Sequence, residues 1–233
     1  MKTKLKAFFI FVTALVVLSS CLIGINDDPS EPSTEKFEYK SKYSGPTFDE
    51  GEIVSYQFMC YVVNRTGQTL EDVEFEIKWV DSTGKTITKD TVTIPRLEKG
   101  AKWPVGVIHD SENDDLDRFA DFDEATIKYI SASSDFSRYT TNLIVNGQVI
   151  YDGTTAFAHG TVRNNNTYKV LDPIVYIVSE TSSGKYIAEY GMDKGAGEIS
   201  PLGFEFGAVL NPRAKTPSTT THYFFAVARR SSI

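Results

Sequence analysis

An internal repeat constrains this chain of 233 residues more than any other feature. When the sequence is shifted along itself by 100 positions, segment 62–87 aligns with 162–187 without a gap, and eight positions are identical. These are Val62/Val162, Asn64/Asn164, Asp72/Asp172, Ile77/Ile177, Ser82/Ser182, Gly84/Gly184, Lys85/Lys185 and Ile87/Ile187. A repeat of this kind indicates two similar structural units in tandem, because each copy specifies the same local structure.

Each copy has the alternation that is typical of half-buried β-strands. In segment 73–79, apolar residues alternate with charged ones, and segment 54–62 contains a second apolar row of period two. The turn composition of 81–84 ends the first of these runs, and β-branched residues follow it. The two apolar rows are Val73, Phe75, Ile77, Trp79 and Val54, Tyr56, Phe58, Cys60, Val62.

Short strands that are separated by turns fill about 100 residues in each half, which is the size of a small β-sandwich. We therefore predict an all-β protein with two tandem immunoglobulin-like β-sandwich domains, at 37–137 and 138–233. In the second domain, Asn146-Gly147 lies between apolar runs and predicts a tight hairpin turn.

The first 20 residues have the pattern of a secretory signal peptide. Three lysines precede an uncharged apolar segment at 7–18, which is shorter than the ~20 residues of a transmembrane helix. Leu18-Ser19-Ser20-Cys21 then resembles the lipobox of bacterial lipoproteins. This resemblance implies cleavage before Cys21 and lipidation of its thiol, which would provide a membrane anchor. An ordinary signal peptide with a chance cysteine is the alternative.

Residues 21–36 are poor in apolar side chains and rich in proline, serine and acidic residues, which predicts a flexible tether. The formal net charge is −7, and removal of residues 1–20 with their three lysines lowers it to −10. Such an acidic chain is unsuited to nucleic acid or to electrostatic binding of an anionic bilayer. We expect the lipids to anchor it on the extracytoplasmic side of a bacterial membrane, at the cell surface or in the periplasm.

The first copy resembles the FxLYD domain, an immunoglobulin-like β-sandwich of bacterial lipoproteins and secreted proteins. The resemblance rests on 62–64, 71–73, 79–81, 84–85 and the turn 97–100. The second copy keeps 160–165, Asp172 and Gly184-Lys185 but departs from the pattern at 179–181. The resemblance implies a cell-envelope module without a shared active site.

No catalytic constellation is evident, so we expect a protein that is not an enzyme and needs no cofactor. His109, His159 and His222 are far apart in the sequence and are expected to be isolated surface or edge residues. Cys60 lies on an apolar row and is expected to be buried and inert.

One acidic segment allows two interpretations. Asn113, Asp115, Asp117, Asp121 and Glu124 occupy positions 1, 3, 5, 9 and 12 of a calcium-binding loop, but Arg118 stands where that loop needs glycine. The favoured alternative is a short helix with Ser111 as its N-cap and with Leu116, Phe119 and Ala120 facing the sandwich.

The two copies differ most on the outward face of the long strand. Where the first copy has Glu74, Glu76 and Lys78, the second has Ile174, Tyr176 and Val178. The second copy's strand is therefore apolar on both faces, and we predict that the three residues form an interaction surface. The first domain, the segment around Phe136 and Tyr139, a partner protein or a second copy are the candidates to cover it.

These features together predict a non-catalytic, membrane-anchored lipoprotein of the cell envelope that binds or scaffolds another envelope or extracellular protein. The alternative is a calcium-dependent or carbohydrate-binding module of the kind found in adhesins.

The lipobox prediction is tested by changing Cys21→Ser. We expect this variant to leave the membrane fraction or to remain unprocessed, because it has no thiol to carry a lipid. Metabolic labelling with a fatty-acid analogue should mark the parent but not the variant. Equal labelling of the two proteins would contradict the prediction.

Overall fold

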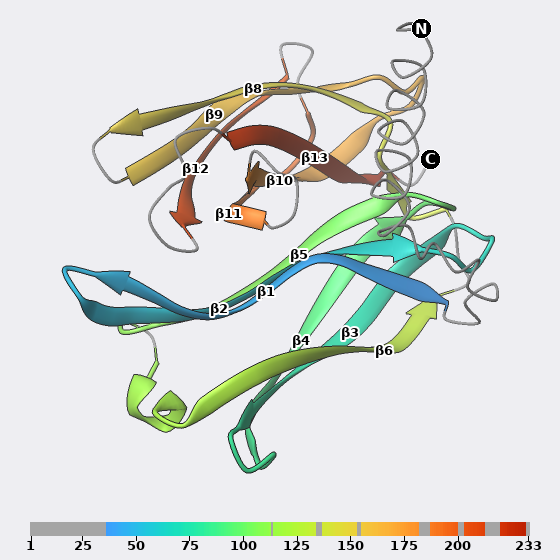
Figure 1. The fold of residues 1–233 in the computed structure, drawn as a ribbon. Coiled ribbons are helices and arrows are strands. Elements are labelled where there is room, and N and C mark those ends of the chain that lie inside the picture. Colours follow the sequence, from blue (N-terminus) through green and yellow to red (C-terminus); the bar gives the residue numbers. More distant parts are fainter. Residues whose placement is uncertain are drawn as a thin grey trace, which may run out of the picture. The chain divides into compact units, whose positions relative to one another are not determined.

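The computed structural model shows an all-β chain, as predicted (Figure 1). It describes residues 36–112, 114–133, 137–152, 155–181, 187–199, 203–212 and 220–231. The predicted signal peptide, with Leu18, Ser19, Ser20 and Cys21, lies outside the described residues, and so does the tether up to residue 35. Residues 36–233 form one compact unit.

The first half contains two antiparallel sheets of three strands each, in the orders β1-β2-β5 and β4-β3-β6. Between them lie Phe58, Cys60, Phe75, Ile77 and Trp79, all of them fully buried. The predicted alternation at 73–79 is therefore confirmed. The strands are β1 (Phe37–Asp49), β2 (Glu52–Asn64), β3 (Leu70–Asp81), β4 (Thr86–Leu97), β5 (Lys102–Asp110) and β6 (Phe122–Ser133).

The second half repeats this strand order. β8-β9-β12 corresponds to β1-β2-β5, and β11-β10-β13 corresponds to β4-β3-β6. β11 also pairs with β12, and β7 pairs with β13, so these strands form one seven-stranded sheet. They are β7 (Tyr139–Thr140), β8 (Leu143–Asp152), β9 (Thr155–Asn164), β10 (Val170–Thr181), β11 (Ile187–Lys194), β12 (Phe204–Pro212) and β13 (Thr220–Arg230).

Two of the residues that are identical in both copies form the same turn. The side-chain amide of Asn64 donates to the carbonyl of Gln68 at 2.7 Å, and Asn164 donates to the carbonyl of Tyr168 at 2.7 Å. Each asparagine also accepts a bond from the backbone two residues later. A short polar side chain that bonds its own turn is the reason why asparagine stands at both positions.

Asp72 and Asp172 share a rare backbone conformation. Their φ angles are 44° and 51°, and the register of β3 and β10 shifts directly after them. Aspartate is among the few residues that tolerate this region, because its short side chain bonds locally. Asp172 accepts bonds from the backbone of Gly197 at 2.9 Å and from Arg229 at 2.7 Å.

The prediction of a hairpin turn at Asn146-Gly147 is wrong. Strand β8 continues through these two residues and pairs with β9 from Leu143 to Asp152. Packing accounts for this glycine. A β-carbon at Gly147 would lie 2.5 Å from the ring of Phe224, and Gly160 on β9 faces Gly147 directly. The glycines allow a close approach of backbone and ring rather than a turn.

The two halves are held together by the outer face of the first sheet. On β2, Met59 and Tyr61 point away from the first core but are fully buried. The ring of Tyr61 lies 6.1 Å from that of Phe225, and Trp103 lies 5.4 Å from Tyr176. β10 and β13 therefore pack on β2 and β5, and one apolar cluster extends across both halves (Figure 1).

A buried acid fixes the segment between the halves. Glu71, with no exposed surface, bonds Arg96 at 2.7 Å and accepts the backbone N–H groups of Arg138 and Tyr139 at 3.1 and 3.2 Å. Arg96 also reaches the exposed carboxylate of Glu98 at 3.4 Å. The carboxylate of Glu71 thus satisfies donors on three residues.

Replacement of Glu71 by glutamine should lower the free energy of unfolding by about 3 kcal/mol, because Arg96 would lose its buried counter-charge. The matched control is Glu98→Gln, which removes an exposed partner of the same arginine and should cost less than about 1 kcal/mol. Urea unfolding measures both variants. Equal losses would show that the buried carboxylate has no special role.

Candidate functional site

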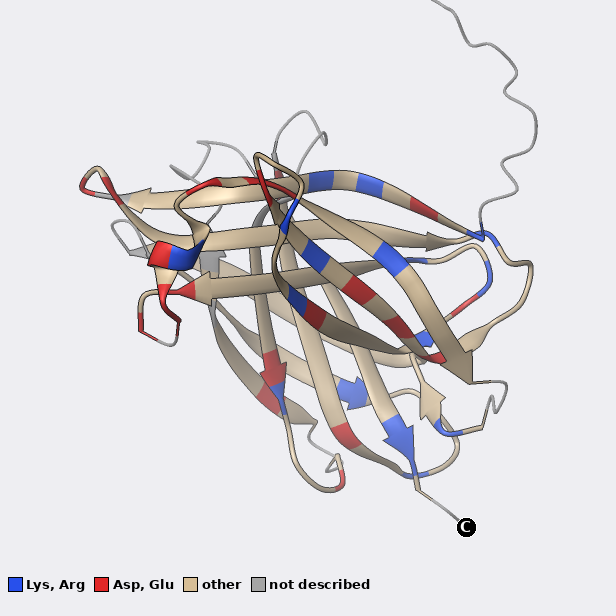
Figure 2. Cartoon of the chain, turned by 90° about the horizontal axis from the view of Figure 1, so that it is seen from below, with Lys and Arg blue, Asp and Glu red and all other residues tan. Residues whose placement is uncertain are grey.

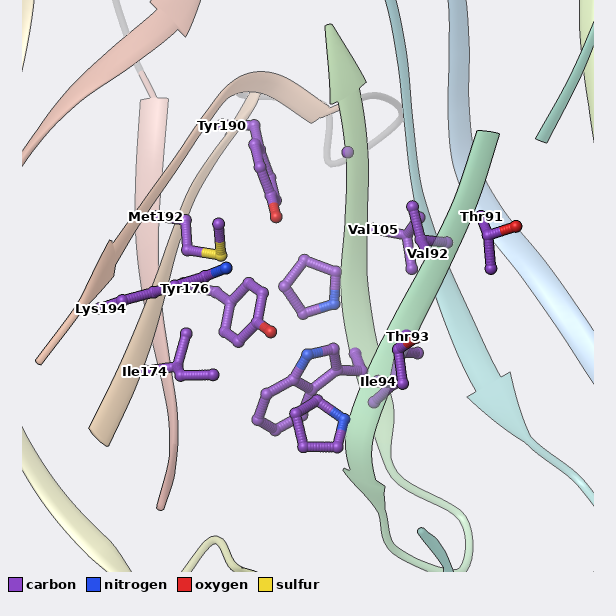
Figure 3. A pocket seen from close by; sticks show the side chains of 14 residues that line it. Thr91, Val92, Thr93, Ile94, Val105, Ile174, Tyr176, Tyr190, Met192 and Lys194 are labelled. Carbon is purple, nitrogen blue, oxygen red and sulfur yellow. The ribbon is translucent and has the colours of Figure 1, made fainter. Parts of the chain in front are cut away.

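A cleft of about 440 Å³ opens between β4 and β5 on one side and β10 and β11 on the other (Figure 3). Its walls are mainly apolar and aromatic. Among the described residues that line it, none is acidic and Lys194 alone is charged. This volume is within the usual range of ligand sites. The lining residues are Thr91, Val92, Thr93, Ile94, Pro95, Trp103, Pro104, Val105, Gly106, Ile174, Tyr176, Tyr190, Met192 and Lys194.

Two strand edges form one wall of the cleft. β4 ends the sheet β4-β3-β6 and β5 ends the sheet β1-β2-β5, so the backbone of each has one side without a neighbouring strand. Five consecutive residues of β4 and four of β5 line the cleft. Such edges present unpaired N–H and C=O groups, which an extended peptide can bond.

The second half supplies the opposite wall, where Figure 3 shows Ile174, Tyr176, Tyr190, Met192 and Lys194 facing β4. Burial, together with the nearby Tyr139, raises the pKa of Tyr176 to about 12, so this phenol stays protonated at physiological pH. Met192 is 40% exposed at the rim. The wall is thus uncharged except at Lys194.

Trp103 joins the two walls. Its ring packs against Tyr176, and its indole nitrogen is buried without an acceptor among the described residues. Gly106, three residues along β5, leaves room for Tyr190, since a β-carbon there would lie 2.8 Å from its ring. Any side chain at position 106 would displace this tyrosine.

The three residues of the predicted interaction surface, Ile174, Tyr176 and Val178, lie partly in the buried apolar cluster and partly in the wall of the cleft. Val178 is fully buried and Tyr176 nearly so, both in the cluster that includes the first half's core. Ile174 and Tyr176 line the cleft. Of the predicted neighbours, Tyr139 packs against the same cluster, and Phe136 lies outside the described residues.

The acidic segment contains a short 3-10 helix, Leu116–Phe119. Its N-cap is Asp115, whose carboxylate accepts the N–H of Asp117 at 3.1 Å, so the prediction of Ser111 as the cap is wrong. Phe119 is buried and Leu116 half-buried as predicted, but Ala120 is exposed.

Of the candidate calcium ligands, Asn113 lies outside the described residues, and Asp115, Asp117, Asp121 and Glu124 are described. Within the described residues, no three His, Cys, Asp or Glu side chains gather closely enough to hold a metal ion. The carboxylate of Asp115 serves the helix instead.

His109 is not the isolated residue that the sequence suggested. It is buried, and its two nitrogens lie 3.0 Å from Asp90 and 3.1 Å from Asp114. Trp79 donates to the same oxygen of Asp90 at 2.6 Å, and Arg118 bonds Asp114 at 2.7 Å. Burial opposes the charged imidazole, but the two carboxylates outweigh it and raise the pKa of His109 above its ordinary value of 6.5.

The remaining candidates do not form a reactive set. His159 bonds Gln148 at 2.8 Å, and His222 bonds Ser179 at 2.7 Å, on other strands than His109. Cys60 is fully buried as expected, and desolvation raises the pKa of its thiol to about 12, which disfavours the nucleophilic thiolate.

Comparisons with known proteins identify no family for this chain. No family model matches the chain, and no curated protein does. Solved structures that match include a transglutaminase of red sea bream, at 10% identity and a TM-score of 0.27, with 82% of this chain and 31% of that chain covered.

Two further structures are equally distant. The C-terminal globular domain of an oligosaccharyltransferase from Pyrococcus abyssi matches at 9% identity and a TM-score of 0.23, covering 85% of this chain and 50% of that one. A structure named pT26-6p matches at 7% identity and a TM-score of 0.21, covering 84% of this chain and 65% of that one. The chain spans less than two thirds of each of these three. In the described part of the chain, no helix is of the length and hydrophobicity that a membrane crossing requires.

The His109 network predicts a pH dependence. Because the pKa of His109 is raised by folding, its contribution to stability is complete below about pH 6.5 and is lost as pH rises through the folded-state value. Urea unfolding between pH 5.5 and 8.5 should show this decline in the parent and not in His109→Gln. The control His159→Gln keeps His109 and should retain the decline. A parent whose stability does not fall over this range would contradict the prediction.

Proposed function

We propose that this protein is a non-catalytic bacterial lipoprotein, anchored in the membrane through Cys21, that binds an extended apolar segment of another envelope protein. The observation that carries the proposal is the cleft, where two sheet edges and an apolar wall face each other. The lipobox-like sequence and the resemblance to FxLYD domains support the envelope location.

An extended peptide suits both walls of the cleft. The edges of β4 and β5 offer backbone hydrogen bonds at the lining positions other than Pro95 and Pro104, which have no N–H. Ile174, Tyr190 and Met192 offer apolar contacts for alternate side chains. Lys194 has no carboxylate partner among the described residues, so it favours a segment that carries an acidic side chain or a terminal carboxylate.

In the cleft, a peptide is favoured over a sugar because carbohydrate binding would call for exposed aromatic faces there, and Tyr176 and Tyr190 are only 7% and 9% exposed. Both tryptophans are buried, since Trp79 has no exposed surface and Trp103 is 5% exposed. Trp103 is also enclosed by Tyr176 and Phe225, at ring distances of 5.4 and 5.6 Å. The aromatic groups of the cleft therefore contribute depth and apolar surface rather than an open platform.

A photo-crosslinking amino acid in place of Met192 tests the proposal in cells. We expect a specific adduct, mapped by mass spectrometry to an apolar segment of one envelope protein. The change Ile174→Lys in the same chain should weaken it by about tenfold or more, since an apolar contact worth about 1.5–3 kcal/mol is lost.

The matched control places the crosslinker at Ile130 on β6, which is 48% exposed and does not line the cleft. Adducts of equal yield from both positions, or an adduct from position 192 that Ile174→Lys leaves unchanged, would refute binding in the cleft. Thermal melting of each variant verifies that the fold is retained.

A further inference from the structure

Strand β8 is an edge strand without the usual protection. It ends the seven-stranded sheet, and β9 is its one hydrogen-bonded neighbour among the described strands. Its one charged residue, Asp152, is the last of the strand, and residues 143–151 include no charged residue and no proline. Edge strands normally carry charges, prolines or bulges that prevent pairing with another chain, and β8 has none of these over nine residues.

The other described sheet edges are interrupted by charges or prolines, which limit pairing to short segments. Among the described strands, β1, β4, β5 and β6 also end sheets, and each carries charged residues. β1, β4 and β5 contain a proline as well. β7, at the other end of the seven-stranded sheet, has only two residues. Among the described edge strands, the longest run without a charge or a proline is therefore that of β8.

The sequence of β8 is self-complementary about Gly147. Two antiparallel copies that cross at Gly147 would place apolar residues opposite apolar residues and amides opposite amides. The pairs are Leu143 opposite Tyr151, Ile144 opposite Ile150, Val145 opposite Val149, and Asn146 opposite Gln148. Pairs of β-branched residues, and of amides, stabilise antiparallel strands when they lie directly opposite each other. This symmetry is what a two-fold interface requires, because the same strand must serve as both partners.

The outer face next to this edge carries apolar side chains at both ends of β8, with Asn146 and Gln148 between them. Ile144 and Ile150 are 46% and 50% exposed, and Phe157, which pairs with Ile150 on β9, is 43% exposed. In the two-fold pair, Ile144 of one copy would extend the row that Ile150 and Phe157 form in the other. Adjacent apolar side chains at an open edge are typical of an interface.

We propose that β8 pairs with β8 of a second copy of this chain around a two-fold axis at Gly147, which joins two seven-stranded sheets into one. The pairing closes on itself, so it produces a dimer rather than a fibre. It goes beyond the proposed function and is independent of it, because β8 contributes no residue to the cleft.

Two differently tagged copies of the full chain, expressed together, test the dimer and its register. Purification through one tag should recover the other copy of the parent. Ile144→Lys combined with Ile150→Lys in both copies should reduce that recovery at least tenfold, because each lysine would face another. Ile144→Lys combined with Ile150→Glu should restore it, because opposite charges would then face each other twice.

Disulfide crosslinking provides a second measurement that does not depend on weakening the pair. Ile144→Cys in one tagged copy and Ile150→Cys in the other should form a mixed disulfide, since opposite residues of antiparallel strands lie about 5 Å apart. Either variant expressed with itself should not, because positions 144 and 144 of the two copies would be far apart.

Failure of the parent copies to co-purify would overturn the proposal, and so would equal recovery of the lysine–lysine and lysine–glutamate variants. Absence of the mixed disulfide would overturn the register. Ile144 and Ile150 are exposed, so these changes leave the core intact, and thermal melting checks this. The crosslinking at position 192 is read independently, so it reports on the cleft whether or not the dimer forms.

Discussion

The arrangement of residues 36–233 depends on one strand that is apolar on both of its faces. From Tyr56 to Val63 every residue of β2 is buried. The inner row packs on β3, and the outer row, with Met59 and Tyr61, needs a second cover. β13 and β10 provide it, since Phe225 packs against Tyr61 and Tyr176 packs against Trp103 of the neighbouring β5, and β10 too is apolar on both faces. Each such side chain contributes roughly 1.5–3 kcal/mol on burial, so these contacts outweigh the ion pair of Lys102 and Glu180 at their margin.

The sequence predicted the strands and the second apolar face of β10 because both follow from a period of two. The outer face of β2 was equally visible as a near-continuous apolar run at 58–63, which is typical of a strand buried on both sides. The cleft was beyond prediction. Trp103 lies far from Tyr190 and Met192 in the sequence, and their meeting depends on which sheet faces pack together.

Local signals failed where tertiary packing imposed another demand. Asn146-Gly147 has the composition of a turn, yet Gly147 is required by the ring of Phe224 and by Gly160 across the strand pair. Asp90, on β4, is 19 residues away from His109 in the sequence. The packing of the two sheets brings its carboxylate to within 3.0 Å of the His109 ring. Conversely, Asn64 and Asp72 recur at 164 and 172 because the backbone needs them, so identity between the copies indicates geometry rather than chemistry.

Differences between the copies indicate where surfaces meet. The outer face of β3 carries Glu74, Glu76 and Lys78, and Glu76 pairs with Lys89 of β4 at 2.9 Å, so solvent can cover this sheet. Figure 2 shows charged positions recurring along its strands. The corresponding face of β10 has no charge at these positions and is covered by the first half. The charged outer face of β3 therefore stays in contact with solvent, whereas the uncharged face of β10 packs against the first half. On the seven-stranded sheet, Ile144 and Ile150 leave apolar side chains exposed at the edge strand β8, which the proposed pairing with a second copy would cover.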